Sequence, residues 1–145
     1  MGFQTNLLTA LGEYLHAENV GRWLSGGGSY SPSDTALVVD TLPASPDKGI
    51  GMTLYPVEDK GTTDSVIGLQ LIVRGSPNNR ATVKDITDRT FDALHDLQAV
   101  TLGGIPVVRI WRQSGANLGP DSNNRQQASE NYYLQVTRTG ANRRD

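Results

Sequence analysis

The sequence predicts an α+β fold in which a mixed, mostly antiparallel sheet of four to five strands packs against two helices, in the order α-β-β-α-β-β-β. Two segments repeat apolar residues at three- and four-residue spacing, which is typical of amphipathic helices. Several shorter segments alternate apolar and polar residues, which is typical of strands. Sixteen glycines and seven prolines indicate many turns. The chain of 145 residues fits a single domain, 1–145, that buries roughly two thirds of its unfolded surface.

The composition excludes several classes of protein. Apolar residues make up 37% of the chain and aromatic residues only 6%, so we expect an aliphatic core. The net charge is −2 with no block of like charges, whereas a dedicated nucleic-acid binder needs a basic patch. The absence of cysteine excludes disulfides and thiolate metal sites. The first 21 residues lack the features of a signal peptide or a membrane span, so we expect the protein to stay in a cytoplasm until it assembles.

The N-terminal region predicts a helix followed by a loop. Apolar residues at helical spacing predict an amphipathic helix over residues 4–17, with Thr5 or Asn6 as its N-cap. Trp23 follows this helix, and we expect it to pack onto the core. Residues 25–34, SGGGSYSPSD, have the composition of a flexible loop, and they lack the Gly-Lys-Ser/Thr ending of a phosphate-binding loop.

The next region predicts two strands. Residues 49–57 and residues 66–74 both alternate with period two, and a polar turn separates them. A short apolar run at 36–39 precedes them and is followed by a turn-rich connector.

A second amphipathic helix is predicted within residues 79–97. Asn78 would cap an early start, whereas a capping box from Thr82 to Asp85 would start the helix later, and the sequence leaves both open. On the outer face, Lys84 and Asp88 are spaced to form an ion pair, as are Asp85 and Arg89.

The C-terminal third predicts a hairpin, a loop and a closing strand. Residues 100–102 and 105–111 flank Gly103-Gly104, a pair that suits a two-residue hairpin turn. Residues 113–127 are polar and rich in turn formers, which predicts a long loop of the kind that is often functional or disordered. Residues 129–138 predict a final strand, and residues 139–145 a disordered tail.

No motif predicts catalysis. His16 and His95 lie near helix ends, where a cation complements the helix dipole. The carboxylates of the second helix alternate with basic residues, which favours a solvated face over an acid–base pair or a cation site. The chain has no nucleophile elbow and no complete dinucleotide fingerprint. We therefore expect no enzymatic activity, no catalytic residue, no metal and no cofactor.

Five segments together resemble the tail terminator or minor capsid family of long-tailed bacteriophages. These segments are LPASPDKGIGMTLYP, LQLIVRG, TFDALHDL, VTLGGIPVVRIWRQS and NYYLQV. The resemblance covers roughly residues 36–138, and no single motif carries it. It implies a tail-terminator-like fold and a structural role in a virion.

The resemblance also implies a function and a set of partners. Tail terminators cap the tail tube as a hexameric ring, stop its growth and offer a joining surface to the head-completion or connector protein. The implied partners are other copies of the chain, the tail-tube protein and the head-side connector. DNA would pass the pore without specific binding, which suits the small net charge. No membrane is implied, and the protein would be found in the tail-neck region of the virion and in the host cytoplasm during assembly.

We expect the assembly interface in the loop at 113–127 and the adjoining strand end. The residues that we assign to a subunit or partner-ring interface are Arg109, Trp111, Arg112, Gln113, Asn117, Leu118, Asp121, Asn124 and Arg125. Second candidates in two other polar segments are Tyr30, Glu58, Asp59 and Lys60. Two alternatives stay open: another neck, head-completion or tail-tube protein of the same virion, and a small α+β enzyme of the host.

Overall fold

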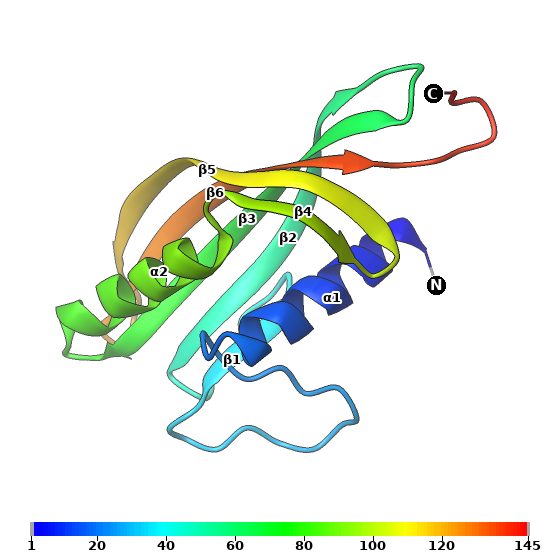
Figure 1. Ribbon diagram of the computed structural model, residues 1–145. Coiled ribbons are helices and arrows are strands. Elements are labelled where there is room, and N and C mark those ends of the chain that lie inside the picture. The colour runs from blue at the N-terminus through cyan, green and yellow to red at the C-terminus, as the bar shows by residue number, and fades with distance from the viewer. Residues whose placement is uncertain (1, 145) are drawn as a thin grey trace.

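The chain folds into one six-stranded sheet with two helices on one of its faces (Figure 1). The computed structural model describes residues 2–144. In chain order the elements are α1 (Phe3–Ala17), β1 (Thr35–Val39), β2 (Lys48–Asp59), β3 (Asp64–Pro77), α2 (Arg80–Leu94), β4 (Leu97–Leu102), β5 (Ile105–Pro120) and β6 (Arg125–Thr137).

The sheet has the order β1-β2-β3-β6-β5-β4. Of the five neighbouring strand pairs in this sheet, β1 and β2 are parallel and the other four are antiparallel. The predicted α+β class with a mostly antiparallel sheet and two helices is therefore confirmed. The predicted four to five strands and the order α-β-β-α-β-β-β are wrong, because β1 adds a strand and the order is α-β-β-β-α-β-β-β. The five residues of β1 are too short a run to show a period on their own.

A long hairpin replaces the loop that was predicted at 113–127. Strand β5 continues to Pro120 and β6 begins at Arg125, so that only four residues form the turn. The side chain of Asp121 accepts the backbone N–H groups of Asn123 and Arg125, which closes the turn. This strand was not predicted because β5 has bulges between Arg112 and Ser114 and between Asn117 and Gly119. Each bulge interrupts the two-residue alternation by which a strand is identified in a sequence.

Both helices lie close to their predicted positions, but their caps differ from the prediction. Helix α1 starts one residue earlier, with Gly2 as its N-cap and no side-chain bond, so neither Thr5 nor Asn6 caps it. Helix α2 is capped by Asn79, whose Oδ1 accepts the N–H of Ala81 at 3.0 Å. Asn78 and the box from Thr82 are therefore both wrong as caps.

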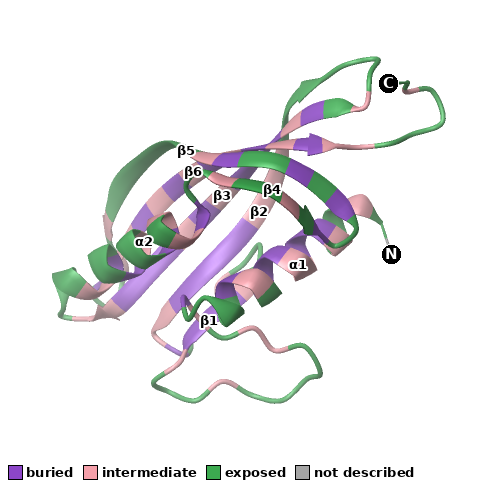
Figure 2. Ribbon diagram, viewed as in Figure 1, coloured by how far each residue is buried: buried purple, intermediate pink, exposed green. Residues whose placement is uncertain are grey.

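Buried residues lie along both helices and the strands of the sheet (Figure 2), and their mostly aliphatic side chains form one core. The largest fully buried side chains are Tyr132, Leu7, Leu11, Leu15, Leu37, Ile50, Met52, Leu69, Leu71, Ile86, Leu94 and Ile110. Trp23 is half-buried and packs against this core, as predicted. Its indole ring lies against Gly12 of α1, which leaves no space there for a β-carbon. Among the described residues, no helix lies on the opposite face of the sheet.

Two buried arginines hold the segment that connects β1 to β2. Arg74 donates to the carbonyls of Pro43, Pro46 and Asp47 at 2.6, 2.9 and 2.7 Å. Arg125 donates to the carbonyl of Ala44 at 2.7 Å and forms an ion pair with Asp121 at 2.8 Å. Burial lowers the pKa of Arg74, and the nearby positive charge of Arg125 lowers it further.

Of the tail predicted to be disordered, residues 139–145, Asp145 lies outside the described residues, and residues 139–144 are placed against the turn between β2 and β3. Arg143 donates to the carbonyls of Thr62 and Asp64, each at 2.7 Å. The backbone of Arg144 pairs with Gly61 and Thr63 on the same turn, at 3.0 Å in both cases. The residues that follow β6 therefore brace the tip of the β2–β3 hairpin.

We predict that Gly12→Ala destabilises the protein, although alanine favours a helix by about 1 kcal/mol over glycine. The added methyl group would overlap the Trp23 ring, and overpacking costs on the order of 1–3 kcal/mol. Urea denaturation should show a lower free energy of unfolding for the variant. In a Trp23→Ala background the ring is gone, so Gly12→Ala should become stabilising. Equal effects in both backgrounds would contradict the predicted packing.

Candidate functional site

The outer half of β5 forms a free edge of the sheet. Strand β4 pairs with β5 only as far as the pair Leu97–Ile110. From Trp111 to Pro120, β5 has β6 on one side and, among residues 2–144, no strand on the other. The stretch Gln113–Pro120 contains no charged residue, and all of it except Gly119 is exposed. Proteins usually place charges on such edges or cover them, so this stretch is a candidate for pairing with another chain.

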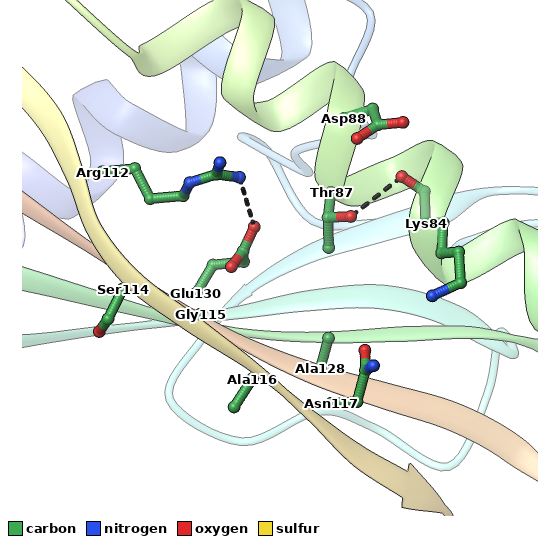
Figure 3. A pocket seen from close by; sticks show the side chains of 10 residues that line it. All are labelled: Lys84, Thr87, Asp88, Arg112, Ser114, Gly115, Ala116, Asn117, Ala128 and Glu130. Atoms are coloured by element: carbon green, nitrogen blue, oxygen red, sulfur yellow. Dashed lines mark hydrogen bonds and ion pairs between the residues drawn. The ribbon is translucent and has the colours of Figure 1, made fainter.

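A groove of about 630 Å³ runs beside this edge, between α2 and the end of the sheet (Figure 3). Helix α2 supplies one wall, β5 supplies the other, and β6 supplies the floor. The residues that line it are Lys84, Thr87, Asp88, Arg112, Ser114, Gly115, Ala116, Asn117, Ala128 and Glu130. An added strand could therefore bond to the edge through its backbone and place side chains in the groove.

A buried carboxylate lies on the floor of the groove. Glu130 is only 7% exposed, and its Oε1 lies 3.3 Å from Nη1 of Arg112. Burial raises the pKa of the Glu130 carboxyl, and the positive charge of Arg112 opposes that shift. Gly115 lies opposite this carboxylate, and a β-carbon at that position would overlap it. The glycine thus lets β5 pass close to the ion pair.

Aromatic and histidine rings anchor Arg112 to the end of α2. The Arg112 guanidinium lies 4.4 Å from the centre of the Phe91 ring, and the His95 ring stacks on Phe91 at 4.5 Å. His95 Nδ1 accepts the backbone N–H of Arg112 at 3.1 Å. His16 accepts the N–H of Trp23 in the same way at 2.9 Å. His16 lies in the last turn of α1 and His95 is the C-cap residue of α2, so both lie at helix ends as predicted.

The helix wall of the groove carries a cation without an ion-pair partner. The predicted pair of Lys84 with Asp88 does not form, and no carboxylate of residues 2–144 lies within ion-pair distance of the Lys84 amine. The predicted pair of Asp85 with Arg89 is also absent, and Arg89 contacts the backbone carbonyl of Asp85 instead. In Figure 3 the Lys84 amine points from α2 toward the strands.

The face of the sheet without helices carries a row of aromatic residues. Tyr55, Gly68, Tyr133 and Trp111 lie side by side on β2, β3, β6 and β5. The Tyr55 ring lies over Gly68, and the Trp111 ring meets the Tyr133 ring edge-on at 5.9 Å. The guanidinium of Arg109 lies 5.0 Å from the centre of the Trp111 ring. This row therefore faces away from the groove.

The structure divides the interface residues that the sequence predicted. Arg112 and Asn117 line the groove, and Gln113 and Leu118 lie along the same free edge; 52% of Leu118 is exposed. Arg109 and Trp111 belong to the opposite face of the sheet.

Three further residues of that prediction, Asp121, Asn124 and Arg125, belong to the hairpin turn. Arg125 is 5% exposed, and its side chain bonds to the carboxylate of Asp121 and to the carbonyl of Ala44. Both Arg125 and Asp121 therefore have a structural role. The Asn124 amide donates to Asn78 at 2.6 Å.

The second candidates lie elsewhere. The Tyr30 hydroxyl donates to the carbonyl of Leu37 at 2.9 Å, which ties the glycine-rich loop to β1. Glu58, Asp59 and Lys60 lie at the tip of the β2–β3 hairpin, where Glu58 and Lys60 form an exposed ion pair at 3.2 Å. None of these residues contributes to the groove.

Sequence reasoning missed the helix wall and the floor of the groove. Lys84 and Asp88 were interpreted only as a solvated face, and Glu130 was not singled out. The alternation that places Tyr132, Leu134 and Val136 on the inner face of β6 also places Glu130 there. That signal could have predicted a buried carboxylate in the last strand.

The groove has the chemistry of a binding surface. It holds no cysteine, serine–histidine pair or other activated nucleophile. In the described part of the chain, no three His, Cys, Asp or Glu residues gather closely enough to hold a metal ion. Nor is any described helix long and apolar enough to cross a membrane.

We predict that Glu130→Gln stabilises the protein increasingly as the pH rises from about pH 4 to about pH 8. Because the pKa of Glu130 is raised by folding, the folded chain binds this proton more tightly, and the contribution of Glu130 to stability falls as the carboxyl ionises. Glutamine keeps the shape without the charge. Thermal melts across this range should show a widening difference from the native protein, whereas Glu13→Gln on the exposed face of α1 should show none. A constant difference would contradict the prediction.

Comparisons with known proteins place the chain in a family. The family of bacteriophage tail terminator proteins matches residues 14–138. Among solved structures, a chain titled "Virion of native gene transfer agent (GTA) particle" shares the fold with a TM-score of 0.55 and 17% identity, over 69% of this chain and 78% of that chain. A comparison with curated proteins found no match. Since the family match spans far more than half of the sequence, the chain belongs to the bacteriophage tail terminator protein family, whose members are structural components of the virion and not enzymes.

Proposed function

We propose that this protein is the tail terminator of its particle. In this role, copies form a ring, hexameric by analogy with the family that the sequence resembles, on the last ring of the tail tube. The ring stops growth of the tube and offers a surface to the head-completion or connector protein. The observation that carries the proposal is the family match over residues 14–138, which includes all six strands and α2.

The structure supports this proposal through the surfaces that it leaves free. A closed ring requires two different patches on each copy, because a head-to-tail contact joins unlike surfaces. The free edge of β5 with its groove is one such patch, and the exposed tip of the β2–β3 hairpin is a second. Gln113, Asn117 and Leu118 therefore stay in the proposed interface. Arg109 and Trp111 stay there as part of the uncovered sheet face.

The proposed partners follow from the position of such a ring. One side of it would contact the tail-tube protein and the other side the head-side connector. Genomic DNA would cross the central opening, and a net charge of −2 would not hold the phosphate backbone there. The protein would then occupy the tail-neck region of the virion, after assembly in the host cytoplasm.

We predict that particles made without this protein carry tail tubes of abnormal, uncontrolled length, because nothing caps the growing end. Electron microscopy of such particles, with tube lengths measured and compared with those of complete particles, provides the test. Adding the purified protein to isolated tubes should attach six copies to each tube end, as measured by mass.

Other outcomes would assign a different role in the same virion. Absent tubes would identify the protein as the tube subunit. Tubes of normal length that fail to join heads would identify another neck or head-completion protein. Either result would overturn the proposed tail-capping role.

A further inference from the structure

We infer that neighbouring copies in the ring are joined by continuing the β-sheet from one copy into the next. The free edge of β5, Gln113–Pro120, would receive the outer edge of β2, Thr53–Asp59, of a second copy as an antiparallel strand. The inference rests on the proposed function only in assuming a ring. It names the occupant of the groove as the β2–β3 hairpin of the adjacent copy.

The first support is that the chain has a second free edge of similar length. Strand β1 pairs with β2 only over Lys48–Met52. The N–H of Asp40 donates to the carbonyl of Met52 at 2.8 Å, and beyond that point no strand among residues 2–144 borders the outer side of β2. Every residue from Pro56 to Thr62 is exposed, and 39% of the surface of Val57 is accessible to solvent. Two long free edges on one sheet provide the two unlike patches of a head-to-tail contact.

The second support is the direction of the two edges. Strands β2 and β3, β3 and β6, and β6 and β5 are each antiparallel, so β2 and β5 run in opposite directions. Copies in a ring keep the same orientation relative to the ring axis. The β2 edge of one copy therefore meets the β5 edge of the next as an antiparallel strand, which is the geometry of strand addition.

The third support is the position of the edges along the strands. The row Tyr55–Gly68–Tyr133–Trp111 crosses the sheet between the two free edges. Most of the β2 edge lies on the side of the row toward the β2–β3 hairpin tip, and the β5 edge lies on the side toward the turn at 121–124. If the centres of the two edges pair, each copy is displaced along the strands relative to its neighbour by about five residues, roughly 17 Å. A closed ring accommodates such a shift when its strands tilt relative to the ring axis, as they do in barrels.

The fourth support is the chemistry of the two surfaces. The β5 edge is uncharged, and the groove beside it presents the unpaired amine of Lys84. The hairpin tip carries the carboxylates of Glu58 and Asp59, which pair with Lys60 at 3.2 Å and with Arg143 at 3.8 Å, so a contact with Lys84 would share these carboxylates. Pro56 removes one backbone donor from the β2 edge, which keeps the pairing short and guards against uncontrolled strand addition. Charge contacts in the groove would supplement the short backbone pairing.

Cross-linking tests this contact directly, because the chain has no cysteine. A variant with Val57→Cys and Ala116→Cys, assembled on tail tubes and treated with a short bis-maleimide, should give a ladder of covalent multimers on a denaturing gel. Either cysteine alone should give no ladder, and neither should Val108→Cys combined with Ala116→Cys, because Val108 is exposed but lies on the part of β5 that β4 already pairs with.

The possible failures are distinguishable. Six copies per tube end without a ladder from the Val57 and Ala116 pair would overturn the sheet contact and leave the proposed function intact. Dimers from Ala116→Cys alone would show that two β5 edges pair with each other, which also overturns it. Absence of the native protein from tube ends would overturn both proposals together.

A charge exchange gives a second, independent test. Lys84→Glu should reduce the number of copies retained on tube ends at least tenfold, because it places like charges at the contact. Glu58→Lys in the same chain should restore most of the binding by reversing the pair. Arg89→Glu, on the same helix as Lys84 but outside the groove, is the matched control and should have no effect. Failure of Glu58→Lys to rescue Lys84→Glu would contradict the proposed contact.

Discussion

Two buried guanidinium groups, those of Arg74 and Arg125, hold together the end of the sheet from which the free β5 edge extends. They bind four carbonyls of the connection between β1 and β2, while Arg125 also binds Asp121 in the β5–β6 turn. Eight residues is a short connection between parallel strands, which usually need a dozen or more. A buried arginine is tolerated only when its donors are satisfied, so the connection and the turn depend on the same pair of side chains.

The sequence predicted the parts of the fold whose pattern is local. Both helices and the alternating strands at 49–57 and 66–74 follow from periodicity alone. Strand β5 was predicted to be a loop beyond Arg112 for two reasons. Bulges interrupt its alternation, and neither face of Gln113–Pro120 is buried, so apolar and polar residues do not alternate there. Strand β1 was missed because its four apolar residues, 36–39, fit either a strand or a buried loop. The order of strands depends on contacts between residues that are distant in sequence, which a single chain does not reveal.

The candidate site was predicted only in part, and for a similar reason. Arg112, Asn117 and Leu118 were assigned to an interface because the segment after Trp111 is polar and unusually long, and that assignment stays a proposal. Lys84 and Glu130 were missed because a groove is formed by elements that are far apart in the sequence. Arg125 was assigned to the same interface because an arginine in a polar stretch suggests exposure, whereas the structure shows it buried and bonded to Ala44 and Asp121.

The bond from the backbone of Arg112 to His95 has a consequence for the design of such a sheet. Its donor is the group that an extended β4 would engage, so one imidazole decides where β4 stops and where the free edge begins. Lengthening β4 past this point would shorten the binding edge, and removing the imidazole would leave a bare amide at its start. The side chain of His95 therefore marks the residue of β5 at which the free edge begins.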